Sequence, residues 1–146
     1  MEDEKIKDAI LSLASENDDY DSHAYFFVNG AVSHTVEKIS RDPDGQGARH
    51  VSGKELIEGA LDFAILQYDF LAPQVFEYWG LRAGSDLGAI VYRMIGAGIL
   101  SAGKNDRVED FDGPEDLPAL LRERLRNKAA SDRRRIEPRP LPPISK

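Results

Sequence analysis

The sequence has no cysteine among its 146 residues. This absence excludes disulfides, thiol catalysis and cysteine-ligated zinc, and it fits a reducing compartment. The sequence also lacks any apolar run approaching the ~18 residues that a membrane span needs. Its first residues, Met1 to Glu4, are acidic, whereas a secretory signal begins with basic residues. We therefore expect a cytoplasmic protein with no membrane partner.

Histidine is scarce as well, with only three residues, His23, His34 and His50. None of them has a second histidine at the four-residue spacing of a helical metal site. There is no Gly-x-Ser-x-Gly motif for a nucleophilic serine either. The sequence therefore predicts no metal, no cofactor and no catalytic constellation. One enzyme hypothesis stays open, in which His50 or the carboxylates of Asp106 and Asp110 act as the chemical groups.

Apolar residues, by contrast, make up 41% of the chain, enough for a substantial core in one domain of this length. They recur every three or four residues, which is typical of amphipathic helices. We expect helices at about 4–15, 23–40, 52–70, 73–79, 86–98 and from about 117. The expected core contains Leu56, Ala60, Leu61, Ile65, Phe76, Trp79, Ile90, Val91, Met94 and Ile95.

Two helix boundaries have clear local signals. Ser52 followed by Glu55 forms a capping box, in which each side chain bonds the other residue's backbone N–H. Pro73 suits a first helical turn, and Gly80 suits the left-handed residue that ends a helix.

The order of elements over residues 52–112 indicates a winged helix-turn-helix. After the helix at 86–98, a turn-rich stretch between two short extended pieces predicts a small β-hairpin near 99–111. The predicted fold is therefore mainly α, a compact domain of five or six helices that is winged-helix-like. The 86–98 helix is a poor reader of DNA bases, because it offers one arginine, Arg93, beside Asp86.

Charge is distributed unevenly along the chain. Residues 1–121 have 10 Lys and Arg against 23 Asp and Glu, a net charge of −13, and residues 122–146 have 9 against 3, a net charge of +6. We expect one helical domain at 1–130 and a disordered, proline-rich basic tail at 131–146.

The basic run has three alternative interpretations. It binds nucleic acid or the ribosome through phosphate contacts, it is a solvated helix end, or it lies across the protein's own acidic face. The residues of the nucleic-acid hypothesis are Arg126, Lys128, Arg133, Arg134 and Arg135. Further on, Arg139 to Pro143 resembles a polyproline ligand with a flanking arginine, or else forms a stiff extended terminus.

The leading hypothesis is a non-catalytic binding or adaptor protein with an unknown protein partner. Its expected surface consists of polar residues that have no evident core role, namely Arg49, His50, Arg82, Arg93, Lys104 and Arg107. Arg49 and His50 also precede the capped helix, where they would either hold an anionic group or pair with a nearby carboxylate.

Several segments together resemble a family of small hypothetical proteins described mainly from planctomycetes and verrucomicrobia. These segments are Arg49–Gly59, Trp79–Arg82, Asp86–Val91, Ala97–Ser101 and Asp106–Phe111, and the resemblance covers about residues 24–112. The family has no assigned activity, so the resemblance implies no catalytic residues and marks only the 49–112 block as the defining part. This chain departs from the family pattern at Tyr92–Met94 and in the basic end after residue 121.

Overall fold

The computed structural model describes residues 2–40, 51–100 and 111–135. Over these ranges the chain is helical and has no strand, which confirms the prediction of a mainly α fold with five or six helices. The elements are α1 (Glu2–Glu16), α2 (Ser22–Ser40), α3 (Gly53–Tyr68), the 3₁₀ turn η1 (Asp69–Leu71), α4 (Ala72–Trp79), α5 (Gly84–Gly96) and α6 (Leu117–Arg135). None of the described helices combines the length and apolar character required to span a bilayer.

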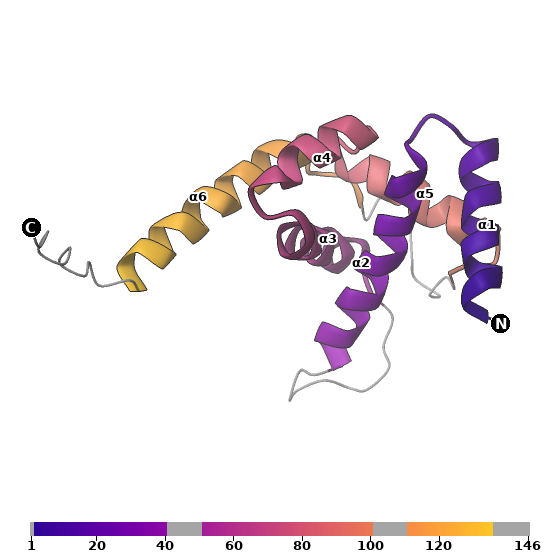
Figure 1. The fold of residues 1–146 in the computed structure, drawn as a ribbon, viewed down its shortest axis with the longest axis horizontal. Helices are drawn as coiled ribbons and strands as arrows, with labels where there is room; N and C mark the ends of the chain where they lie inside the picture. The colour runs from indigo at the N-terminus through magenta and orange to yellow at the C-terminus, as the bar shows by residue number, and fades with distance from the viewer. Residues whose placement is uncertain (1, 41–50, 101–110, 136–146) are drawn as a thin grey trace, which may run out of the picture.

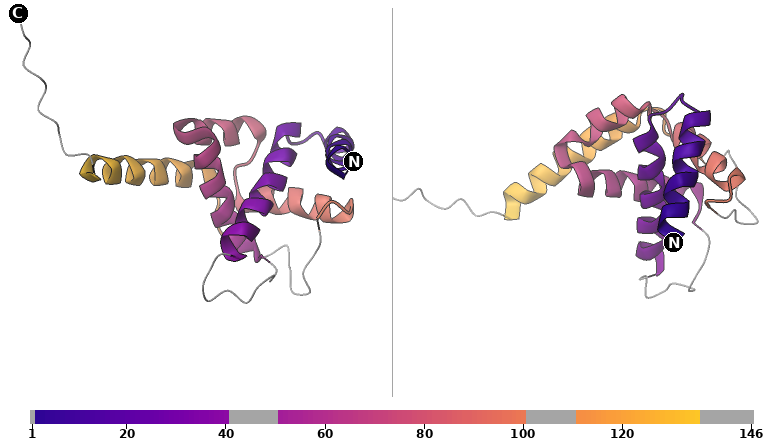
Figure 2. Two further views of the ribbon diagram at one scale, coloured as in Figure 1. Left: turned by 60° about the horizontal axis from the view of Figure 1, so that its bottom comes forward. Right: turned by 45° about the vertical axis from the view of Figure 1, so that its right-hand side comes forward.

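The helices are arranged around α2 and α3, which form the most extensive contact in the described structure. α1 and α2 lie side by side in opposite directions, joined by a short turn (Figure 1). α4 lies along α6, and the C-terminal end of α6 extends away from the other helices in every view (Figures 1 and 2).

The predicted capping box at the start of α3 is confirmed. The Ser52 hydroxyl accepts from the backbone N–H of Glu55, and the Glu55 carboxylate accepts from that of Ser52, both at 3.1 Å. Two of the N–H groups that lack helical partners are thereby satisfied.

The ends of α4 also follow the sequence signals. Pro73 lies in the first turn, and Gly80 has a φ of 85°, the left-handed conformation that glycine adopts without strain. α5 begins at Gly84, two residues before its predicted start, and the carboxylate of Asp86 accepts from the backbone N–H groups of Arg82 and Ala83 at 3.0 and 2.8 Å.

The core draws on all six α-helices, and its largest fully buried side chains include Tyr25, Phe76, Leu61, Ile90 and Met94. Of the ten predicted core residues, eight are buried, while Ile65 and Ile95 are partly buried at its margin. The three- and four-residue periodicity over 52–95 thus identified the interior of this part of the chain.

The buried face of α2 differs from the predicted one. The spacing of Val32, Val36 and Ile39 in the sequence predicts one apolar stripe, but Val36 is 45% exposed and the other two are partly exposed. The helix instead buries Phe27 and Thr35, because α3 approaches α2 closely at this level. A Cβ atom added to Gly59 of α3 would lie 1.8 Å from the Thr35 hydroxyl oxygen, so glycine is what allows the two helices to approach.

The winged-helix prediction is not supported. After α5, the backbone N–H groups of Ile99 and Leu100 both donate to the carbonyl of Met94, at 2.9 and 3.2 Å. They close the end of the helix and are not available for a strand ladder. At the other flank, Phe111 is in a helical turn and buried against Gly88. The flanks of the predicted 99–111 hairpin are therefore not strands, and residues 101–110 lie outside the described ranges.

The C-terminal boundary also differs from the expected one. α6 continues to Arg135, five residues into the segment predicted as tail. Asp116 stabilises its start, since its carboxylate accepts from the backbone N–H of Ala119 at 3.0 Å, and Pro118 fits the first turn. The prediction for residues 136–146 lies outside the described ranges.

The close approach of α2 and α3 generates a stability prediction. Gly59→Ala should lower the free energy of unfolding by about 1–3 kcal/mol, because the new methyl group overlaps Thr35 and the helices must separate. Gly96→Ala is the matched control, since nothing lies within 4 Å of the added Cβ atom at the end of α5. Urea denaturation measures both variants, and equal effects of the two substitutions would contradict the tight contact.

Candidate functional site

The predicted binding residues are only partly described. Arg49, His50, Lys104 and Arg107 lie outside the described ranges. So do Asp106 and Asp110, which with His50 formed the enzyme hypothesis. The two described members differ in setting: Arg82 is exposed, whereas Arg93 is held by hydrogen bonds within the protein.

Arg93 joins α5 to the turn between α1 and α2. Its guanidinium donates to both carboxylate oxygens of Asp19, at 2.7 and 2.8 Å, and to the hydroxyl of Tyr25 at 2.9 Å. It also lies over the ring of Tyr20, 5.3 Å from the ring centroid. A two-pronged arginine–carboxylate pair fixes orientation as well as distance. This arrangement therefore positions the turn, and three of the five N–H donors of Arg93 are used for it.

Two tyrosine hydroxyls complete the connection. Tyr20 donates to the carboxylate of Asp86 at 2.6 Å, and Tyr25 donates to the carbonyl of Asn17 at 2.8 Å. Burial raises the pKa of both tyrosines, reinforced at Tyr20 by the bond to Asp86 and opposed at Tyr25 by Arg93. Both hydroxyls consequently keep their protons at neutral pH.

The pKa values of Asp19 and Arg93 shift in the directions expected for an ion pair between them. The hydrogen bond from Arg93 lowers the pKa of the Asp19 carboxyl, and the same bond raises the pKa of Arg93. Asp21 in the same turn also has a lowered pKa, chiefly because it accepts the backbone N–H of His23. Both carboxylates are charged in the folded protein at neutral pH.

The basic run of α6 lies against acidic residues of α3, η1 and α4. Arg122 pairs with Glu77 at 2.5 Å, Arg124 with Glu58 and Asp62, and Lys128 with Asp69 at 3.3 Å. The described part of the run thus matches the intramolecular alternative. Each exposed pair contributes about 0–1 kcal/mol, but four of them along one helix fix its direction against α4.

This result bears on the nucleic-acid hypothesis. Lys128, one of its residues, is already paired with Asp69, whereas Arg126 is exposed to solvent. Arg133, Arg134 and Arg135 are placed in the last turn of α6 by its backbone. The second half of the helix has no apolar stripe, and its C-terminal end extends from the other helices (Figure 2).

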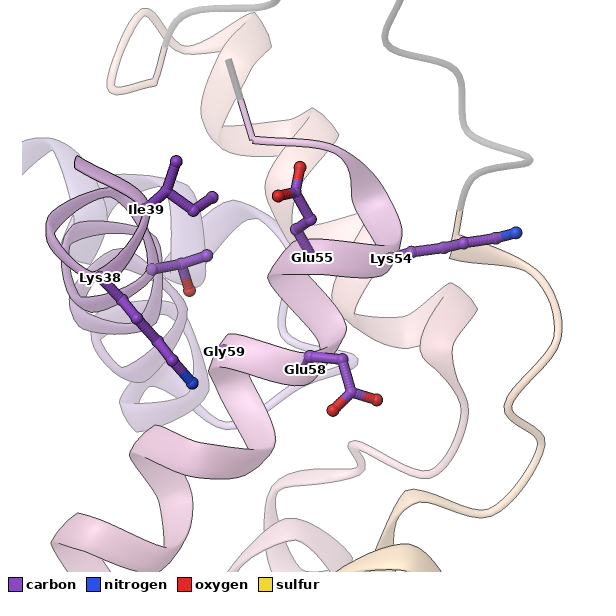
Figure 3. A pocket seen from close by; sticks show the side chains of 7 residues that line it. Lys38, Ile39, Lys54, Glu55, Glu58 and Gly59 are labelled. Atoms are coloured by element: carbon purple, nitrogen blue, oxygen red, sulfur yellow. The ribbon is translucent and has the colours of Figure 1, made fainter. Parts of the chain in front are cut away.

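A first groove, of about 480 Å³, lies between α2 and α3 (Figure 3). Three of its four charged residues already have partners within the chain: Lys38 pairs with Asp62, Glu58 with Arg124, and Glu55 caps α3. Lys54 points away from α2 (Figure 3). The groove therefore offers little unsatisfied polar chemistry to a ligand.

A second groove, of about 550 Å³, has an aromatic lining, and we call it the α4 groove. Its residues are His23, Tyr68, Leu71, Gln74, Val75, Tyr78 and Trp79. The rings of Tyr68 and Trp79 meet edge to face, with centroids 5.6 Å apart. Trp79 is 7% exposed and forms part of the floor, whereas Tyr78 is 80% exposed.

Exposed apolar side chains concentrate in the stretch of sequence that supplies most residues of this groove. Seven large apolar residues of the described ranges are exposed, and four of them fall within the 13 residues from 66 to 78. They are Leu66, Phe70, Leu71 and Tyr78, with exposures of 69, 76, 46 and 80%. Clustered apolar exposure on a folded domain marks an interaction surface more often than scattered exposure does.

The sequence-based prediction missed this surface, although a signal for it was present. Phe70, Leu71 and Tyr78 are large apolar residues that lie off the stripe defined by Ala64, Tyr68, Phe76 and Trp79. The predicted binding surface consisted of polar residues, whereas these apolar residues outside the core stripe are the exposed ones.

No protein-family model, curated protein or solved structure matches this chain. The resemblance to the planctomycete and verrucomicrobial family thus stays a prediction. Among the described residues, no three histidine or acidic side chains gather closely enough to hold a metal ion.

The role of Arg93 is testable against Arg82, the other described arginine of the predicted set. Arg93→Lys should lower the free energy of unfolding by about 1–2 kcal/mol, because lysine cannot donate to both Asp19 oxygens and to Tyr25 at once. Arg82→Lys changes an exposed side chain and should stay within about 0.5 kcal/mol of wild type. Chemical denaturation measures the free energy of unfolding of both variants. Equal losses in Arg93→Lys and Arg82→Lys would contradict the role of Arg93 in positioning the turn.

The Asp19–Arg93 pair also predicts a pH dependence. The folded-state pKa of Asp19 lies below its ordinary value of 3.8, so the unfolded chain takes up the proton first as pH falls. The pair therefore stabilises the protein above that ordinary value, and the contribution is lost as pH falls through the folded-state pKa. Urea denaturation of wild type and Asp19→Asn should show their largest stability difference near neutral pH. A difference that stays constant down to full protonation would contradict the pair.

Proposed function

We propose that this protein is a non-catalytic protein-binding module that contacts its partner through the apolar surface around the α4 groove. The observation behind the proposal is the exposure of Leu66, Phe70, Leu71 and Tyr78 within one 13-residue stretch. The cytoplasmic location expected from the sequence belongs to the same proposal.

The energetics favour a partner on this surface. Phenylalanine and tyrosine each have roughly 150–250 Å² of area to bury, and Phe70 and Tyr78 leave more than three quarters of their side chains in water. Covering both rings would contribute on the order of 5 kcal/mol at about 25 cal/mol per Å², before the entropic cost of association. Aromatic residues are also enriched among those that dominate protein interfaces.

The floor of the α4 groove is held in place by the core. Phe27 of α2 lies 5.4 Å from the ring of Trp79 and 6.4 Å from that of Tyr68, measured between centroids. Phe76 supports Trp79 as well, at 6.4 Å. A surface whose base is fixed before binding loses less conformational entropy when the partner arrives.

The test compares the proteins captured from native cell extract by the full-length chain and by the double variant Phe70→Ala, Tyr78→Ala. We expect specific partners of the wild type to be lost from the double variant, because its apolar contact area is removed. Both substituted residues are exposed, so thermal unfolding should stay close to that of wild type.

The matched control is Leu11→Ala, which removes a 44% exposed leucine from α1. This variant should capture the same proteins as wild type. Capture of an identical set by the Phe70, Tyr78 double variant would overturn the proposed surface.

A further inference from the structure

The aromatic lining of the α4 groove suits an apolar ligand. Of the segments outside the described ranges, only one contains several large apolar residues. Residues 41–50 contain no large apolar side chain, and residues 101–110 contain only Val108. Residues 136–146 contain Ile136, Leu141 and Ile144 together with four prolines.

Distance also excludes the 41–50 segment as a ligand of the α4 groove. It is attached to Ser40, at the opposite end of α2 from His23, about 26 Å away at 1.5 Å per residue. Its other end is attached to Val51, just before α3. A ten-residue loop that is anchored at both ends reaches at most about 18 Å from its anchors, because half of its length is needed for the return. This reach is short of the groove.

The C-terminal segment, by contrast, has the reach. α6 runs antiparallel to α4, as the pairs Arg122–Glu77 and Lys128–Asp69 show. From Lys128, beside the start of α4, the helix continues only about 10 Å to Arg135. Extended chain adds about 16 Å by Pro140 and about 27 Å by Pro143. This length is sufficient to return to Leu71 and follow α4 to Tyr78.

We infer that the α4 groove binds the proline-rich segment 140–143 of the same chain, an inference that rests on the proposed binding role of this surface. Aromatic-lined grooves bind polyproline helices, whose rings pack on aromatic faces and whose free carbonyls accept hydrogen bonds. Tyr68, Tyr78 and Trp79 supply the faces, and the Gln74 amide and Tyr78 hydroxyl are donors.

Tethering supports this ligand, because it raises the effective concentration of the segment to roughly the millimolar range, so that a weak site is occupied within one molecule.

Trp79 is the only tryptophan in the chain, so its indole N–H gives a single NMR resonance that reports on the groove. The experiment compares the full-length wild type with the variant Pro140→Ala, Leu141→Ala, Pro142→Ala, Pro143→Ala. We expect the indole resonance to shift, by the same amount over a wide range of protein concentration. In a Tyr78→Ala background the tail substitutions should cause no further shift, whereas in a Leu11→Ala background they should act as in wild type.

An unchanged indole resonance after the tail substitutions would overturn the inference. A shift that depends on protein concentration would assign the ligand to a second copy, which also overturns binding within one chain. Neither result affects the capture experiment on Phe70 and Tyr78. Conversely, loss of the proposed partner role in that experiment would leave a Trp79 shift intact, so the two failures are distinguishable.

Discussion

The packing of Phe27 among the rings of α3 and α4 is the contact on which the rest of this structure depends. Phe27 is buried on α2, and its ring centroid lies 5.3 to 6.4 Å from those of Phe63, Tyr68, Phe76 and Trp79. Tilted and edge-to-face contacts of this kind are favourable and directional. They fix α4 against α2 and leave Tyr78, two residues after Phe76, directed to solvent. One buried ring thus secures both the core and the floor of the exposed groove.

Charged residues then specify how the outer parts attach to this core. The apolar cluster does not by itself fix the path of the α1–α2 turn, whereas the pair between Asp19 and Arg93 admits one geometry. At the other end of the domain, Arg122, Arg124 and Lys128 direct α6 along the acidic residues of α3, η1 and α4. Part of the opposition between an acidic domain and a basic C-terminal region is therefore resolved inside the molecule.

Among the described surfaces, the arrangement favours apolar recognition over recognition of charge. The described cations of α6 mostly face acidic partners, and most charged groups of the α2–α3 groove are paired, whereas Phe70 and Tyr78 remain in water. Binding through this surface needs no change in the core, because Trp79 and Tyr68 are already held by Phe27. The domain thus presents apolar side chains on a fixed base, and this is the face that the proposed partner or the chain's own proline-rich segment would cover.

The sequence by itself determined the helices and most of the interior. The periodicity of residues such as Leu61 and Ile90 and the local chemistry of Ser52 and Gly80 act within a few residues, so they can be read from the chain. Only the tertiary structure decided that Arg93 meets Asp19, that Val36 is exposed beside a Gly59–Thr35 contact, and that Ile99 and Leu100 close α5 without forming a strand. It also left the side chains of Phe70 and Tyr78 outside the core. These outcomes depend on which helix faces are brought together, and a helical pattern specifies that a face is apolar without specifying what will cover it.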